Sequence, residues 1–234
     1  MTAPAPRLDG KPDLTGLWQT ERTPDSEFAR VLGDGYSTLQ VDTRDITKNV
    51  ASVFWGMKPD EEPLRPEAAS ILKHRLQNQL ERPITQCLPG GIPLAMLIFT
   101  FKMIQSPQEI VMLPESGDPP RQIYTDGRSL PKDPEPTRWG TQLASGRVIR
   151  WWSKQQASTT GRGSTHSATR SESMRITERY HRRDFGHMDL EITFDDPKYY
   201  TRPWTVRIPH DLVPDNDIFE MSNENEKDAA HIKQ

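Results

Sequence analysis

Three stretches in the C-terminal part of the chain alternate between apolar and polar residues. They cover residues 174–180, 188–194 and 204–208. A period of two places successive side chains on opposite faces of a β-strand. Each stretch is therefore predicted to be a strand with one buried and one wet face. Asp184-Phe185-Gly186 separates the first two stretches and is predicted to form a hairpin loop.

The middle of the chain holds further strand candidates. Residues 96–104 and 109–113 are rich in Ile, Val, Met and Phe, and Ser106-Pro107-Gln108 between them favours a tight connection. Residues 122–125 are predicted to form a third strand. Together with the C-terminal strands they predict an antiparallel meander. Closing that meander into a lipocalin-like barrel would remove its exposed edges.

One prominent helix is predicted over residues 66–80. Pro66 suits the first position of a helix, and leucines recur every four residues at 72, 76 and 80. The predicted fold class is therefore mainly β with a single helix. Residues 1–13 are Pro-rich and polar and are predicted to be a flexible N-terminal arm. Residues 14–234 are predicted to form a single β-rich domain, irregular over much of 20–62.

Composition excludes several classes of protein. The 234 residues carry 30 basic and 33 acidic side chains, a net charge of -3, which does not favour binding to nucleic acid. The single cysteine, Cys87, leaves no internal disulfide, and a small buried side chain is favoured over a nucleophile there. No metal or nucleotide motif is present, so no cofactor is expected. The longest apolar stretch, residues 92–101, is too short for a membrane span.

Residues 140–170 differ from the rest of the chain. These 31 residues contain five basic and ten Ser or Thr residues but no Asp or Glu. Extending the overall acidic content to this length predicts roughly four acidic residues. A disordered Ser/Thr-rich loop is the simplest interpretation.

The flanks of this segment suggest a second interpretation. The motifs Pro12-Asp13-Leu14-Thr15-Gly16-Leu17-Trp18, Cys87-Leu88-Pro89-Gly90-Gly91-Ile92-Pro93, Tyr124-Thr125-Asp126-Gly127-Arg128 and residues 175–180 and 196–204 together resemble a large bacterial family of mostly exported proteins that has no assigned reaction. In that family, a strand reading Trp-Glu-Gly-Asp-Thr-Leu-Val-Val-Glu-Thr-Thr-Gly stands where this chain has its unusual segment. The resemblance covers nearly the whole chain outside that segment.

Back-translation relates residues 145–153 of this chain to the strand sequence of that family. Permitted codons for residues 145–153, read from the third base of the first codon, encode Trp-Glu-Gly-Asp-Thr-Leu-Val-Val. Tryptophan has one codon, so Trp151-Trp152 forces a valine in the shifted frame. We hypothesise that residues 139–170 are a frame-shifted, irregular segment, and that the chain as written loses one or two strands there.

The resemblance also bears on location. The family's members usually carry an export signal, whereas this chain begins without a charged or apolar leader. As written the chain is expected to be cytoplasmic. A mature or truncated form would be periplasmic or secreted.

The best individual clue to function is Glu178. It occupies the apolar face of its strand together with Tyr180, where burial would favour acid/base chemistry or pairing with an arginine. Glu178 and Tyr180 are therefore the candidate catalytic residues. Four further residues are candidates for substrate binding: Tyr124 and Trp204 on the pocket wall, and Glu109 and Arg128 near strand ends.

Two functions fit this pattern. In the first, a β-barrel pocket binds a small hydrophobic molecule and transforms it by acid/base chemistry. In the second, the domain binds or interacts without catalysis and its interior is packed. A continuous cavity containing Glu178 favours the first function. Pairing of Glu178 with Arg179, Arg121 or Arg128 in a packed interior favours the second.

Overall fold

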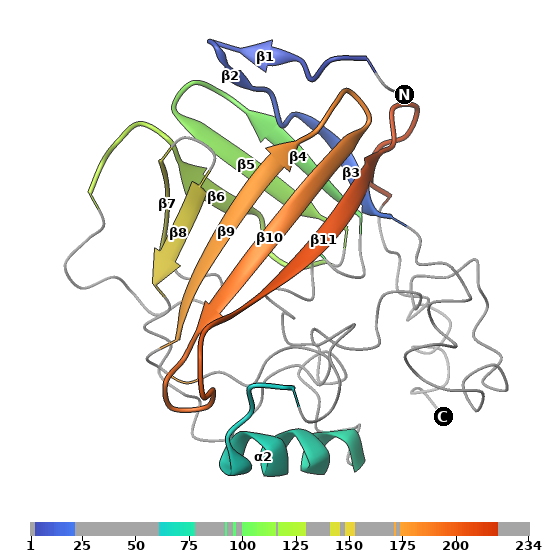
Figure 1. The fold of residues 1–234 in the computed structure, drawn as a ribbon. Helices are drawn as coiled ribbons and strands as arrows, with labels where there is room; N and C mark the ends of the chain where they lie inside the picture. The colour runs from blue at the N-terminus through green and yellow to red at the C-terminus, as the bar shows by residue number, and fades with distance from the viewer. Residues whose placement is uncertain are drawn as a thin grey trace, which may run out of the picture.

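The computed structural model describes residues 3–21, 61–77, 92, 96, 100–115, 117–129, 141–145, 148–152, 171 and 174–219. Its elements are β1 Arg7–Leu8, β2 Lys11–Pro12, β3 Gly16–Thr20, α2 Pro66–Gln77, β4 Phe101–Gln105, β5 Glu109–Pro114, β6 Arg121–Tyr124, β7 Thr141–Ser145, β8 Val148–Trp152, β9 Arg175–Arg182, β10 His187–Asp195 and β11 Trp204–Leu212 (Figure 1). The chain is mainly β, as its alternating sequence predicts.

The main strands form a barrel in the order β10-β11-β3-β4-β5-β6-β7-β8-β9, with β9 pairing back to β10. Consecutive strands pair antiparallel within β3–β6 and within β7–β11, so the predicted meander is confirmed. Strand β11 then pairs with β3, which joins the two ends of the described chain. The ring closes through a single parallel pair, Tyr124 with Leu143.

The strand predictions need small corrections at their ends. The strand predicted from Met96 begins at Phe101, and Met96 itself has helical backbone. Strand β3 is not anticipated by the sequence, because five residues that begin with a glycine carry too short an alternation to be recognised. The predicted helix is confirmed over Pro66–Gln77, and residues 78–80 lie outside the described residues.

The segment 139–170 contains β7 and β8, so the prediction that it is irregular is wrong for those ten residues. Strand β8 pairs with β9 over five residues, from Val148 opposite Arg179 to Trp152 opposite Arg175. The β-branched and aromatic residues of β8 suit an extended backbone, which explains why the chain as written still forms a strand here. The rest of the segment lies outside the described residues.

The expected N-terminal arm contains a small hairpin. Strands β1 and β2 pair through Arg7 with Pro12 and Leu8 with Lys11. Asp9 and Gly10 between them both have positive φ, 50° and 75°, as a type I′ turn requires. The Asp9-Gly10 dipeptide was therefore a readable turn signal within a segment predicted to be a flexible arm.

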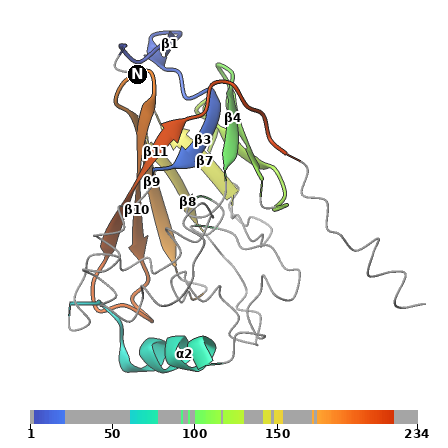
Figure 2. The same cartoon turned by 90° about the vertical axis from the view of Figure 1, so that its right-hand side faces the viewer.

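The hairpin and the helix lie at opposite ends of the barrel (Figure 1, Figure 2). The α2 end is held by Leu64, which forms a β-bridge with Tyr200, and by Arg65, whose Nε donates to the carbonyls of Pro197 and Tyr200. The hairpin end lies beside the turns that join β4 to β5 and β9 to β10. We call this the mouth of the barrel.

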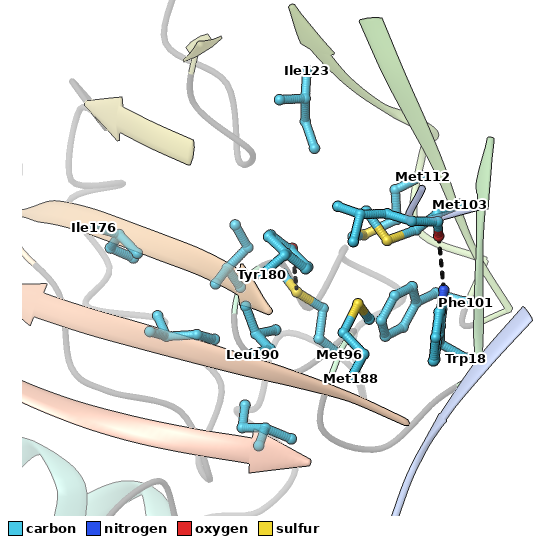
Figure 3. Packing of buried hydrophobic residues seen from close by; sticks show 14 of the residues in the cluster. Trp18, Met96, Phe101, Met103, Met112, Ile123, Ile176, Tyr180, Met188 and Leu190 are labelled. Carbon is cyan, nitrogen blue, oxygen red and sulfur yellow. Dashed lines mark hydrogen bonds between the residues drawn. The ribbon is translucent and has the colours of Figure 1, made fainter. Parts of the chain in front are cut away.

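The barrel interior is filled by side chains of the described strands and by Met96, which precedes β4. Inward residues alternate with outward ones, as in β9, where Ile176, Glu178 and Tyr180 are buried and Arg175 and Arg179 are exposed. The central packing consists of Trp18, Met96, Phe101, Met103, Met112, Ile123, Ile176, Tyr180, Met188 and Leu190 (Figure 3). Among its members four are methionines, whose flexible thioethers fill irregular gaps well.

Candidate functional site

Glu178 lies at the centre of a buried polar cluster. One carboxylate oxygen, Oε1, lies 2.9 Å from Nη2 of Arg121, and the other, Oε2, accepts a 2.9 Å hydrogen bond from the hydroxyl of Tyr180. Strand β6 supplies Arg121 and β9 supplies the other two residues, so the cluster spans the barrel interior. Both charged side chains have zero exposure. A buried charge needs such a partner, because its desolvation would otherwise cost several kcal/mol.

The cluster shifts the ionisation of its members. Burial, and then the negative charge of Glu178, raise the pKa of the Tyr180 hydroxyl well above its usual range. Burial has the largest effect on Arg121 and lowers its pKa, but the charges and hydrogen bonds of Glu178 and Tyr180 together outweigh burial, and the pKa of Arg121 is raised. Tyr180 is therefore held as a neutral donor and Arg121 as a cation.

Met96 covers this cluster from inside the barrel. Its sulfur lies 3.5 Å from the Tyr180 hydroxyl and 4.0 Å from Nη1 of Arg121. The side chain has zero exposure and packs beside Met188 and Phe101 in the core (Figure 3). The predicted pairing of Glu178 with an arginine is thus confirmed, and Arg121 is the partner among the three alternatives.

A pocket opens at the mouth of the barrel, between the β1–β2 hairpin and the β4–β5 turn. We call this pocket the mouth pocket. Tyr180 lines the mouth pocket and also belongs to the buried cluster. Its lining residues are Leu8, Asp9, Lys11, Pro12, Leu14, Gln105, Ser106, Pro107, Ile110, Thr125 and Tyr180.

Gln105 at the end of β4 holds the hairpin against the mouth. Its side-chain oxygen accepts a 2.9 Å hydrogen bond from the backbone N–H of Leu14, and its Nε2 donates to the carbonyl of Pro12 at 3.2 Å. These two bonds join β4 to the end of β2 and to Leu14 just after it.

Arg182 makes a second link between the hairpin segment and the barrel. Its Nη1 donates to the carbonyl of Asp13 at 2.7 Å, and its Nη2 donates to the carbonyl of Phe185 at 2.6 Å. The guanidinium also lies over the ring of Trp18, 5.0 Å from the ring centroid. One wall of the mouth pocket therefore depends on Arg182.

Three of the predicted binding residues lie on the outside of the barrel. Glu109 pairs with Tyr124 in the β5–β6 register, and both belong to the face opposite the buried Ile110 and Ile123. Arg128 is exposed, and its guanidinium lies 3.8 Å from the centroid of the Tyr124 ring. The prediction that Tyr124 lines the pocket wall is wrong, because strand parity directs its side chain outward. Glu109 and Arg128, predicted to bind substrate near strand ends, lie on the same outer side, away from the buried cluster.

Trp204 is buried as predicted, but it lies away from the mouth. Its ring stacks on Phe194 with centroids 4.4 Å apart and meets the edge of Tyr200 at 5.5 Å. Tyr200 also pairs with Leu64 near the start of α2, so Trp204 belongs to the α2 end of the barrel. The structure brings Glu178 and Tyr180 together and places Trp204 apart from them.

The site depends on residues that sequence reasoning did not propose. The sequence indicates Arg121 only as a possible partner of Glu178, and it predicts no role in the site for Met96 or Arg182. The burial of Arg121 and Arg182 has no signature in hydrophobic periodicity, because it depends on partners elsewhere in the chain: Glu178 for Arg121 and the carbonyls of Asp13 and Thr15 for Arg182. Cys87 lies outside the described residues.

The described part of the chain holds no candidate for a metal site or for a membrane-spanning helix. No group of three or more His, Cys, Asp and Glu residues in these ranges is placed to hold a metal ion. No helix among the described residues is long and apolar enough to cross a membrane.

The fold and site together define a β-barrel with an ion-paired, packed interior and a pocket at one end. Comparison of the chain with protein-family models, with curated proteins and with solved structures finds no significant match. What the protein does must therefore follow from the geometry of its own residues.

Proposed function

We propose that this protein binds a small, uncharged amphiphile in the mouth pocket and does not transform it. The ligand's apolar chain enters between the hairpin and β5 and points toward Tyr180. Its polar head stays at the rim, in contact with water. The single observation that carries this proposal is a pocket that leads from an exposed polar rim to a buried tyrosine.

The lining of the pocket supports an amphiphile. Leu14 and Ile110 are buried residues of the lining, and Leu8 and Pro12 are half-buried on the hairpin side, so an alkyl chain would meet apolar surface there. Burial of apolar surface contributes about 25 cal/mol per Å². Asp9 and Lys11 are the charged residues of the lining, and both are exposed. Their opposite charges favour a head group without net charge.

The buried cluster supports binding over catalysis. The two carboxylate oxygens of Glu178 are engaged by Arg121 and by Tyr180. A substrate would have to break these contacts before the carboxylate could exchange a proton with it. Such a substrate would also have to pass Met96, which has zero exposure and lies against Tyr180. A packed interior with Glu178 paired to Arg121 fits the non-catalytic alternative.

Titration with n-alkanols tests the proposal, because each has an uncharged head and one apolar chain. Thermal melting and calorimetry should detect saturable binding to the full chain. Leu8→Trp fills the pocket from the hairpin side and should abolish the shift in melting temperature. Ile104→Trp is the matched control, since Ile104 on β4 is 46% exposed and is absent from the lining.

The two variants separate specific from non-specific binding. The proposal expects Ile104→Trp to bind as the parent chain does while Leu8→Trp binds at least tenfold more weakly. Equal loss in both variants, or no saturable binding by the parent chain, would overturn it.

A further inference from the structure

Met96 is fixed in the barrel by its own backbone. Its carbonyl oxygen accepts hydrogen bonds from Thr20 Oγ1 at 3.1 Å and lies 3.0 Å from Nε2 of His210. Thr20 belongs to β3 and His210 to β11, and the two residues are opposite each other in the register of those strands. Two strands of the barrel wall therefore hold the main chain of Met96 in position.

The side chain of Met96 extends from this anchored backbone to the polar cluster. Its thioether lies 3.5 Å from the hydroxyl of Tyr180 (Figure 3). Tyr180 also lines the mouth pocket. One tyrosine thus lies between the pocket and the methionine, and the interior beyond it is occupied by Met96.

Resting on the proposed binding function, we infer that Met96 is the residue that limits the length of the ligand. The alkyl chain enters at the mouth, passes along Tyr180 and ends where the thioether begins. Because the Met96 carbonyl is held by β3 and β11, shortening the side chain leaves a space instead of drawing the backbone inward. Phe101 and Met188 pack beside Met96, so an alkyl chain that enters the space would contact apolar surface there.

A chain-length series of n-alkanols, from pentanol to dodecanol, tests the inference. Affinity should rise about fourfold for each added methylene while the chain is being buried. In the parent chain this rise should stop at a defined length. Met96→Ala removes three heavy atoms and should extend the rise by about two carbons, so that the longest alkanols bind about 16-fold more tightly than to the parent chain.

Two further variants control this experiment. Met174→Ala makes the same substitution at an equally buried methionine, which precedes β9 near the α2 end, and should leave the length limit unchanged. Met96→Leu keeps the bulk of the side chain and should also keep the limit. Met96→Val shortens the side chain less and replaces Met96→Ala if that variant does not fold.

The outcomes separate this inference from the function on which it rests. A longer limit in Met96→Ala alone supports it. An identical limit in Met96→Ala and the parent chain overturns it, while binding that remains sensitive to Leu8→Trp leaves the mouth pocket established. Absence of alkanol binding to the parent chain overturns both proposals.

Discussion

Arg121 on β6 and Glu178 on β9 form an ion pair across the barrel interior, with 2.9 Å between Nη2 and Oε1 and zero exposure of both side chains. The two strands are not neighbours in the sheet. The pair therefore connects two parts of the wall that are separated by β7 and β8, and the hydroxyl of Tyr180 completes it. The interior is specified by charge as well as by apolar packing.

Breaking this pair should be strongly destabilising. Glu178→Gln leaves the Arg121 cation buried without its carboxylate, and the expected loss is about 3–5 kcal/mol in the free energy of unfolding. Adding Arg121→Met to Glu178→Gln removes the stranded charge and should recover part of that loss. Urea denaturation of the two single variants and the double variant measures the coupling. Additive losses would show that the two side chains do not interact.

His210 should make the protein sensitive to acid. Burial lowers the pKa of His210 from 6.5 to about 4, against the opposing effect of the Met96 and Ile208 carbonyls near its ring nitrogens. Between these pH values the unfolded chain binds the extra proton and the folded chain does not. Stability is therefore complete above pH 6.5 and falls by about 3 kcal/mol as the pH drops to 4.

The acid sensitivity can be assigned by substitution. His210→Gln should flatten the dependence of unfolding free energy on pH between about 4 and 6.5. His181→Gln is the control, because that side chain is exposed on β9 and its loss leaves the buried imidazole in place. If His210→Gln retains the full slope, another group is responsible.

Arg182→Lys should loosen the N-terminal hairpin. The guanidinium donates to four backbone carbonyls, those of Asp13, Thr15, Asp184 and Phe185. A lysine ammonium lacks the fork that reaches in several directions, so it cannot replace these bonds. We expect a loss of about 1–3 kcal/mol and faster proteolysis within residues 1–13. Unchanged cleavage at this segment would contradict the role assigned to Arg182.

The frame-shift hypothesis predicts a different peptide from the native gene product. Mass spectrometry of the protein from its source, with resequencing of the gene, should find Trp-Glu-Gly-Asp-Thr-Leu-Val-Val in place of residues 146–153. The unique tryptophan codon makes the valine opposite Trp151-Trp152 the firmest part of this prediction. Native peptides that contain Arg150-Trp151-Trp152 would refute the hypothesis.

Periodicity predicted the strands well where alternation was long. Residues 175–182 and 187–195 carry it over eight and nine positions, and both strands formed with the expected inward face. The alternation in residues 175–182 also predicted correctly that the side chain of Glu178 faces the barrel interior. Short strands gave less guidance: β6 has four residues, and the outward direction of Tyr124 depends on its register with Glu109.

Contacts between distant parts of the chain could not be read from the sequence. Strand β11 pairs with β3 so that Leu212 lies opposite Trp18, and no local sequence pattern predicts that register. The pairing of Arg121 with Glu178 is similar, since three arginines were equally acceptable partners. Local signals did exist for the hairpin, where Asp9-Gly10 requires positive φ at both positions.

Intermolecular nuclear Overhauser effects between decanol and the methyl groups of the protein test the central claim most directly. A ligand in the mouth pocket should give contacts to the methyl groups of Leu8, Leu14 and Ile110, and to the Met96 methyl at the end of its chain. Contacts confined to outward residues such as Ile104, with none to the mouth, would contradict the account.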